Sequence, residues 1–410
     1  MSKNLIKNII SLLGIQGMNY IIPLITLPYL VKTLGPASYG ALGFSLALIQ
    51  YFTRLTDYGF NLTATKDIAS DKDISNVSKV FWSVFVCKFI LTMLSLGILL
   101  LLIEFSSFLY EYKQVILYSF GMVIGSFLFP IWLFQGLEKM GWIAITNIGS
   151  RLITIPFIFI FVTKQEDVWI AALITSLTSI LAGIVSLFYI IKYRWIKIVG
   201  ITKKDIFCQF KSGFHIFLSS GAVSLYTTSI PVFLGFISGP VAVGYYVAAD
   251  KLRLAVQGVI SPVSQAVYPR IVDILSRDKN KAIIFIKKLF VIQAGITLVL
   301  SVIVMACSGV MIHALYGAHY ERSIIILCIL SPTIFLVGVS NVLGTQVMLT
   351  FNHKAAYSKI VIIAAFLNLL IIFPLIYFLS DKGAAIAVLA TELFVVIAMY
   401  SKIKKIGIKI

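Results

Sequence analysis

The stretch LTMLSLGILLLLI, residues 91–103, contains no charged residue, and neither does IVIIAAFLNLLIIFPLIYFL, residues 360–379. An α-helix needs roughly 20 mostly apolar residues to cross the hydrocarbon core of a bilayer. Similar runs recur along the 410 residues, of which 60% are hydrophobic and 12% are charged, with a mean hydropathy of +1.00. The strands of a membrane β-barrel would instead be about ten residues long and of alternating polarity. The sequence therefore predicts an all-α integral membrane protein.

Twelve such segments account for most of the chain, with short connections between them. The predicted crossings are residues 8–31, 40–60, 80–103, 115–133, 140–162, 168–191, 213–237, 241–267, 289–312, 323–351, 355–379 and 383–400. The largest connection, 192–212, is basic and separates six helices from six. We therefore expect a six-helix lobe at 1–191, a basic cytoplasmic linker at 192–212 and a second six-helix lobe at 213–410, arranged around a central cavity.

The two lobes share a short motif near their beginnings. Residues 35–40 read GPASYG and residues 239–244 read GPVAVG, and both follow the first predicted helix of a lobe. Tyr58 and Tyr268 also end equivalent predicted helices. Gly-Pro turns can recur by chance, but several matches in the same order favour a duplication. Repeats with an even number of helices have the same orientation, as in transporters whose halves are related by an axis along the membrane normal.

The formal net charge of +18 would suggest nucleic-acid binding in a soluble protein. Here 24 of the 34 Lys and Arg residues lie on one predicted side of the membrane, mainly in short connections. Basic residues collect in cytoplasmic loops of membrane proteins. We therefore expect no nucleic-acid partner, several crossings of a membrane, and cytoplasmic N- and C-termini. The first apolar segment is too long for a signal peptide and lacks a cleavage site of small residues, so it should be the first crossing.

Six charged residues fall near the middle of predicted helices. A Lys or Arg at that depth costs about 2.5 to 3.5 kcal/mol, so each needs an ion-pair partner or a wet cavity. Four bases against two acids leave a net positive interior, and clustered Lys and Arg suit phosphate groups. The predicted substrate-binding bases are Lys88, Arg151, Lys251 and Arg253, and the predicted sites of ion coupling or charge balance are Asp250 and Glu392.

Arg54 and Asp57 lie nearer the cytoplasmic end of their helix, and their i, i+3 spacing places them on one helix face. They form either a structural pair or a gating pair. The cysteines have no paired spacing and the histidines are dispersed, so we expect no disulfide framework and no metal site. No residue pattern indicates a catalytic group, and no cofactor is expected beyond coupling to a gradient of H⁺ or Na⁺.

Several longer strings narrow the choice of family. They are LPYLVKTLGPASYG from Leu27, DYGFNLTATKDIA from Asp57, PIWLFQGLEKM from Pro130 and VGYYVAADKLRLAVQGVISPVSQAVYPR from Val243. With them the chain resembles the Wzx-type O-antigen flippases, in the polysaccharide transporter branch of the multidrug/oligosaccharidyl-lipid/polysaccharide superfamily. The resemblance extends over essentially the whole chain.

This resemblance implies a MATE-like fold and a function in lipopolysaccharide O-antigen biosynthesis. The expected activity is translocation of undecaprenyl-pyrophosphate-linked oligosaccharide repeat units from the cytoplasmic to the periplasmic leaflet of the bacterial inner membrane by alternating access. The expected partners are the lipid-linked substrate, the membrane, an O-antigen polymerase and a chain-length regulator. The family supplies no compact catalytic motif, so the residues of the cationic cavity rest on the charge argument alone.

Three other functions remain open on the sequence. A MATE-type drug/cation antiporter should have an acidic to neutral cavity, whereas the predicted one is basic. A flippase for another lipid-linked glycan would share the basic cavity. A membrane-embedded O-antigen polymerase would need a large periplasmic loop, which the predicted connections do not provide.

Overall fold

The computed structural model describes residues 3–258 and 260–406, and within these ranges the regular secondary structure is helical, with no strand. By their contacts the residues form two compact units. One unit contains residues 41–232, and the other contains residues 1–40 together with 233–410. The all-α membrane fold expected from the sequence is confirmed by this architecture.

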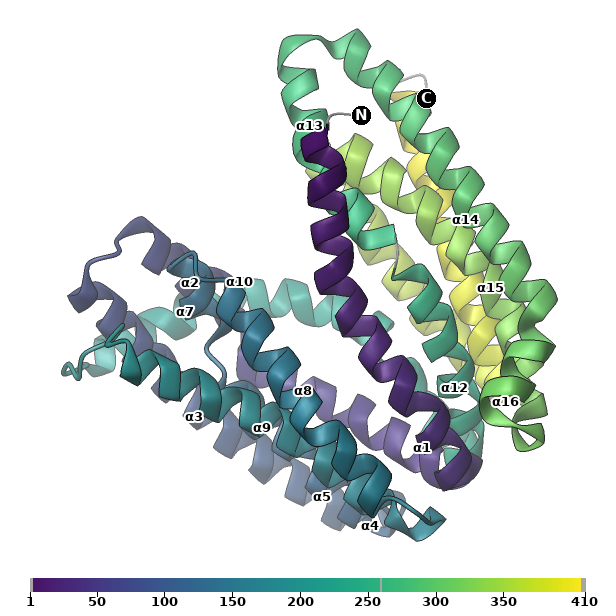
Figure 1. Cartoon of the computed structure of the whole chain (residues 1–410), viewed down its shortest axis with the longest axis horizontal. Helices are drawn as coiled ribbons and strands as arrows, with labels where there is room; N and C mark the ends of the chain where they lie inside the picture. The colour runs from purple at the N-terminus through teal and green to yellow at the C-terminus, as the bar shows by residue number, and fades with distance from the viewer. Residues whose placement is uncertain (1–2, 259, 407–410) are drawn as a thin grey trace. The chain divides into compact units, whose positions relative to one another are not determined.

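The 41–232 unit begins with the second half of α1 (Lys3–Asp57). The elements that follow are α2 (Phe60–Ser70), α3 (Ile74–Phe105), α4 (Ser107–Glu111), α5 (Lys113–Ser119), α6 (Gly121–Leu128), α7 (Ile131–Gly136), α8 (Gly141–Phe161), α9 (Val168–Lys192) and α10 (Lys203–Thr227). Helices α8 and α9 lie side by side, and α9 also packs on α6 (Figure 1). Gly125 permits that last contact, because a Cβ there would lie 2.5 Å from atoms of Ser179. Close backbone approach at glycine is a common way for membrane helices to associate.

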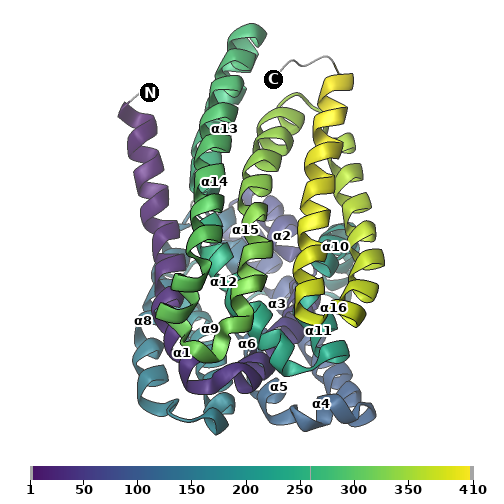
Figure 2. The same ribbon diagram turned by 90° about the vertical axis from the view of Figure 1, so that its right-hand side faces the viewer.

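The other unit contains the first part of α1 and the elements after residue 232. These elements are the rest of α11 (Ile230–Ser238), α12 (Pro240–Gln257), α13 (Ile260–Arg277), α14 (Lys279–Tyr316), α15 (Glu321–Asn341), a π-helical segment (Val342–Leu349) and α16 (Lys354–Lys405). Helix α15 packs against α14, α16 and α12, so it is the central helix of this unit (Figure 2).

Two long helices each contain a break where the sequence predicts a connection between crossings. Helix α1 has non-helical backbone angles at Gly35 (φ 69°), between the predicted crossings 8–31 and 40–60. Helix α16 has them at Ser380 (φ 54°), between 355–379 and 383–400. Seven candidate membrane spans are present in the described residues, and one of them is the whole of α16. With these breaks, the helix order is consistent with twelve crossings.

The repeated GPxxxG motifs have the same backbone conformation and contact each other. Gly35 has φ 69° and ψ 173°, and Gly239 has φ 81° and ψ 172°. A Cβ on Gly40 would lie 1.8 Å from the carbonyl oxygen of Pro240, and a Cβ on Gly244 would lie 2.0 Å from that of Pro36. The last glycine of each motif thus approaches the proline of the other motif. This reciprocal pattern is the one that a two-fold axis produces. The structure thus adds a spatial relation to the sequence repeat.

The contact units differ from the predicted lobes in two places. Residues 1–40 group with the later half of the chain, because the two GPxxxG motifs pack together. Helix α10 groups with the earlier half, because it packs on α2 and α3. The boundaries 1–191 and 213–410 therefore stay a prediction about lobes and do not describe the contact units.

The predicted linker 192–212 is also partly helical. Helix α10 begins at Lys203, after Thr202. The backbone N–H of Thr202 donates to the carboxylate of Asp205 at 2.9 Å, and the backbone N–H of Asp205 donates to the Thr202 hydroxyl at 3.3 Å. This reciprocal arrangement is a capping box, which satisfies N–H groups at a helix start. The irregular part of the connection is consequently short.

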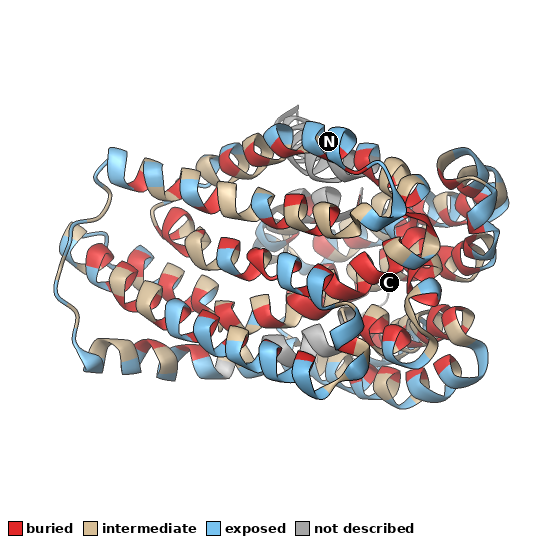
Figure 3. Cartoon of the chain, turned by 90° about the horizontal axis from the view of Figure 1, so that it is seen from below, coloured by how far each residue is buried: buried red, intermediate tan, exposed pale blue. Residues whose placement is uncertain are grey.

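The outer faces of the helices are apolar. Figure 3 shows exposed residues along one side of many helices and buried residues along the other. Many of the exposed residues are large and hydrophobic, such as Leu101 on α3, Ile160 on α8 and Leu370 on α16. In water such surfaces would favour aggregation. On membrane-spanning helices they are the expected lipid contacts.

Candidate functional site: two buried ion clusters

Lys88, at mid-length in α3, has its ammonium group in the interior of the 41–232 unit, with only 2% of the residue exposed. The ammonium lies 3.0 Å from a carboxylate oxygen of Asp57 and donates to the backbone carbonyl of Ser126 at 2.6 Å. The Ser126 hydroxyl donates to the same Asp57 oxygen at 2.9 Å. We call these three residues the Lys88 cluster. A base and an acid from different helices thus neutralise each other.

The backbone explains why Asp57 reaches α3. Helix α1 ends at Asp57, and the next two residues have positive φ, 44° at Tyr58 and 84° at Gly59. Ser126 is near the C-terminus of α6, where backbone carbonyls lack partners inside the helix and the helix dipole favours a cation. The C-terminal ends of two helices therefore hold Lys88, since α1 provides the carboxylate and α6 provides the carbonyl.

Asp57 is paired with Lys88, and not with Arg54, in this structure. Arg54 is exposed, and among the described residues it forms no ion pair with Asp57. The i, i+3 spacing allowed that pair, but the tertiary fold brings Lys88 closer to the carboxylate. The predicted cavity base Lys88 is accordingly neutralised by an acid that the sequence argument had assigned to another residue.

Arg253, on α12, is the centre of a second cluster in the other unit. Its guanidinium lies 2.7 Å from a carboxylate oxygen of Asp250 and donates to Gln257 at 2.6 Å and to the Thr333 hydroxyl of α15 at 3.4 Å. Arg253 is 8% exposed, and it also interacts electrostatically with Glu392 on α16. We call Arg253, Asp250, Gln257, Thr333 and Glu392 the Arg253 cluster. It joins three helices around one cation.

The other two predicted cavity bases have different surroundings. Lys251 is exposed on α12, although its neighbours Asp250 and Arg253 belong to the Arg253 cluster. Arg151 is half-buried at mid-length in α8. The structure therefore places Lys88 and Arg253 in ion clusters of separate units, Lys251 on an exposed helix face, and Arg151 on a third helix.

One buried ion pair was missed by the sequence argument. Asp381 is fully buried beside the break in α16 and lies 2.7 Å from the Nε of Arg322 on α15. Its carboxylate also accepts the backbone N–H of Lys382 at 2.9 Å. Both residues lie between predicted crossings, Arg322 directly before 323–351 and Asp381 between 355–379 and 383–400. A signal was available, since Asp381 is a lone acid directly after a long apolar run.

The described residues contain no group of three or more His, Cys, Asp or Glu side chains that could hold a metal ion. The four cysteines are free, with Cys87 buried and Cys208 and Cys307 exposed. The ionisable groups of the two clusters are two cations, Lys88 and Arg253, and three carboxylates, those of Asp57, Asp250 and Glu392.

The fold is that of known membrane transporters. A solved structure of the lipid II flippase MurJ in an inward closed conformation matches with a TM-score of 0.77 and 17% identity, over 96% of this chain and 87% of that chain. An inward-facing multidrug resistance MATE family transporter of the MOP superfamily matches with a TM-score of 0.72 and 16% identity, over 97% of this chain and 98% of that one. The expected MATE-like fold is confirmed.

Sequence comparison identifies nearer relatives. A protein of Escherichia coli (strain K12) named "Putative O-antigen transporter" is 42% identical over 95% of this chain and 94% of its own length. A protein of the same name from Shigella dysenteriae is 28% identical over 97% of this chain and all of its own length. The model of one protein family, described as polysaccharide biosynthesis protein, matches residues 5–275. With most of its length matched in this way, the chain belongs to the polysaccharide biosynthesis protein family.

Proposed function

We propose that this protein is a flippase that moves undecaprenyl-pyrophosphate-linked O-antigen repeat units from the cytoplasmic to the periplasmic leaflet of the bacterial inner membrane. The observation that carries the proposal is the 42% identity, over nearly the whole chain, to a protein named as an O-antigen transporter. The fold shared with a lipid II flippase adds support, because lipid II is also a lipid-linked glycan. The protein is a transporter and not an enzyme.

In this proposal Lys88, Arg151, Lys251 and Arg253 bind the diphosphate of the substrate during alternating access. Lys88 and Arg253 have carboxylate partners in this structure. Diphosphate binding at these two bases would exchange one anionic partner for another, so neither base is left unpaired in the membrane, while the displaced carboxylate would need a proton or another cation. Arg253 is the better suited of the two, because a guanidinium binds phosphate oxygens in a two-pronged manner.

The acids have a corresponding role in the proposal. Asp250 pairs with Arg253 and Glu392 interacts with it electrostatically, and both acids would take up H⁺ or Na⁺ when the substrate replaces them, which couples transport to an ion gradient. Alternatively they only balance the charge of Arg253. A gating role for Arg54 and Asp57 requires a second state, because Asp57 pairs with Lys88 in this structure.

The proposal includes a location and partners. Both termini and the basic connection after Lys192 would be cytoplasmic, since most Lys and Arg residues lie on that predicted side. An O-antigen polymerase and a chain-length regulator would use the translocated units. Reporter fusions after Lys204 and after Asp381 should give opposite sidedness, and the same side for both would contradict the topology.

The function is tested by deleting the gene in its own bacterium and restoring it on a plasmid. The deletion should remove surface O-antigen and leave lipid-linked repeat units accessible only from the cytoplasmic leaflet, and the plasmid should reverse both effects. Normal O-antigen together with increased drug sensitivity would reject the proposal and favour the drug/cation antiporter, which shares the fold.

A further inference from the structure

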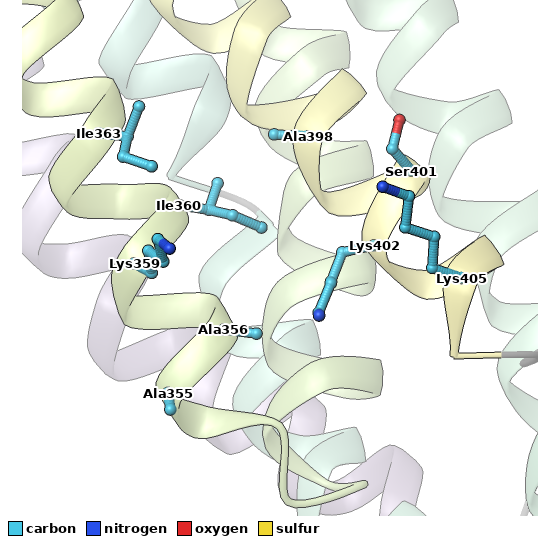
Figure 4. A pocket seen from close by; sticks show the side chains of 9 residues that line it. All are labelled: Ala355, Ala356, Lys359, Ile360, Ile363, Ala398, Ser401, Lys402 and Lys405. Atoms are coloured by element: carbon cyan, nitrogen blue, oxygen red, sulfur yellow. The ribbon is translucent and has the colours of Figure 1, made fainter.

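The two ends of α16 form a groove that the proposed transport function does not use. The break at Ser380 divides α16 into two arms, and residues near the ends of both arms line a volume of about 590 Å³. Figure 4 shows these residues on the facing sides of the two arms. One arm contributes Ala355, Ala356, Lys359, Ile360 and Ile363, and the other contributes Ala398, Ser401, Lys402 and Lys405.

The lining has a basic end and an apolar floor. Lys359, Lys402 and Lys405 provide three ammonium groups, and the lining includes no carboxylate. All three lysines are exposed, and within the described part of the chain none of them takes part in an ion pair. Ile360, Ile363 and Ala398 form the floor. The lining has no aromatic ring and no side-chain amide, which are the groups that usually contact sugars.

The position of the groove along the helices adds a second argument. Lys359 is followed by a run without charge from Ile360 to Ser380, and Lys402 is preceded by a run without charge from Leu393 to Ser401. The lysines thus lie where the apolar part of each arm ends, at the level of lipid headgroups. Basic pockets between membrane helices at this level are suited to anionic headgroups.

We propose that this groove binds an anionic phospholipid of the surrounding bilayer, with the phosphate among the three lysines and an acyl chain along the isoleucine floor. Lysines at the ends of membrane helices can also extend toward water without binding any particular lipid. A specific site differs from that behaviour in being saturable and selective for headgroup charge. The proposal does not depend on the transported substrate.

The test uses the purified full-length chain and native mass spectrometry, which counts bound lipids. Phosphatidylglycerol and phosphatidylcholine with the same acyl chains are titrated separately. The triple variant K359Q/K402Q/K405Q should bind the first phosphatidylglycerol on the order of 100-fold more weakly, or about fivefold for each lysine. Its binding of phosphatidylcholine should not change.

A matched control removes the same charge from another helix. The triple variant K203Q/K204Q/K211Q changes three exposed lysines of α10. It should keep the affinity of the unchanged protein for phosphatidylglycerol. An equal loss in both triple variants would mean that only the overall charge matters, and no loss in the groove variant would mean that the lipid binds elsewhere; either result overturns the proposal.

Competition identifies the occupant. Inorganic phosphate should not displace phosphatidylglycerol, because it lacks an acyl chain to contact the floor. Displacement by phosphate would reduce the groove to a simple anion site. Displacement by undecaprenyl pyrophosphate at much lower concentration than other lipids would assign the groove to the transported lipid. Either result would reject a phospholipid as the occupant.

Discussion

The Lys88 cluster and the Arg253 cluster both pair a buried cation with a carboxylate, but the carboxylate comes from a different place in each. Both neutralise a cation in the middle of a predicted membrane helix, where an unpaired charge is costly. Lys88 obtains its carboxylate from another helix, 31 positions away in the sequence, whereas Arg253 obtains its carboxylate from three positions earlier in its own helix. The first pair therefore depends on how the helices pack, and the second is present wherever α12 is helical. Buried charge in this family fold is stabilised by tertiary contacts in one case and by local spacing in the other.

The largest effect should come from removing Lys88. The variant K88A leaves Asp57 in the interior without its cation, which costs about 3–5 kcal/mol for a buried pair. We expect the free energy of unfolding to fall by that amount and the membrane-inserted protein to decrease, as measured by thermal unfolding in detergent. The double variant D57N/K88M should recover much of the loss, since neither charge remains. If K88A is as stable as the unchanged protein, the cluster is not a structural ion pair.

The two GPxxxG motifs, one in each half of the sequence, contact each other reciprocally. Equivalent substitutions in the two motifs should therefore lower the stability by similar amounts. An alanine at Gly244 or Gly40 places a methyl group about 2 Å from a backbone carbonyl oxygen, so backbone must move. Overpacking of this kind typically costs about 1–3 kcal/mol. Thermal midpoints of G40A and G244A should fall together, while G97A, which has no heavy atom within 4 Å of the new methyl, should show little change. A large effect in only one of the two motifs would contradict the reciprocal contact.

Replacing Arg253 by lysine tests whether the Arg253 cluster needs only a positive charge or also the shape of the guanidinium group. R253K keeps the attraction to Asp250 but loses the second prong, which contacts Gln257 and Thr333. We expect a loss of stability of about 1–2 kcal/mol and a larger fractional loss of O-antigen export per inserted protein molecule. R253A should abolish export. Loss of export in strict proportion to loss of protein, in both variants, would remove Arg253 from the proposed substrate site.

The smallest effect concerns the connection between the predicted lobes. A hydrogen bond from Lys79, with further hydrogen bonds from Thr202, lowers the pKa of Asp205 from 3.8 to about 2. Because the folded pKa is below the unfolded one, this stabilisation is complete above about pH 4 and is lost as the pH falls toward 2. The difference in thermal midpoint between the unchanged protein and D205N should be small and constant from pH 5 to 8, and should shrink below pH 4. A difference that changes between pH 6 and 8 would show that another group titrates.

The two clusters also show how far the sequence could predict the candidate site. Asp250 and Arg253 have the i, i+3 spacing and form an ion pair, whereas Arg54 and Asp57 have the same spacing and Asp57 pairs instead with Lys88. The rule describes one helix, and α1 ends at Asp57, where the chain turns away through Tyr58 and Gly59. Arg322 and Asp381 were missed for a related reason, because they are on different helices and one of them is beside a break.

The sequence by itself determined that this chain is a helical membrane protein with a GPxxxG motif in each half and with charged residues within its apolar segments. That information is local, since a run of about 20 apolar residues must cross the bilayer and must satisfy its backbone hydrogen bonds as a helix. Only the tertiary structure decided which acid neutralises Lys88, that α10 packs on α2 and α3, and that the two GPxxxG motifs contact each other reciprocally. These features depend on distances between residues that are far apart in the chain. Such distances are set when the helices pack against one another. A local sequence pattern can mark a glycine or a helix end, but it cannot say which distant residue will contact it.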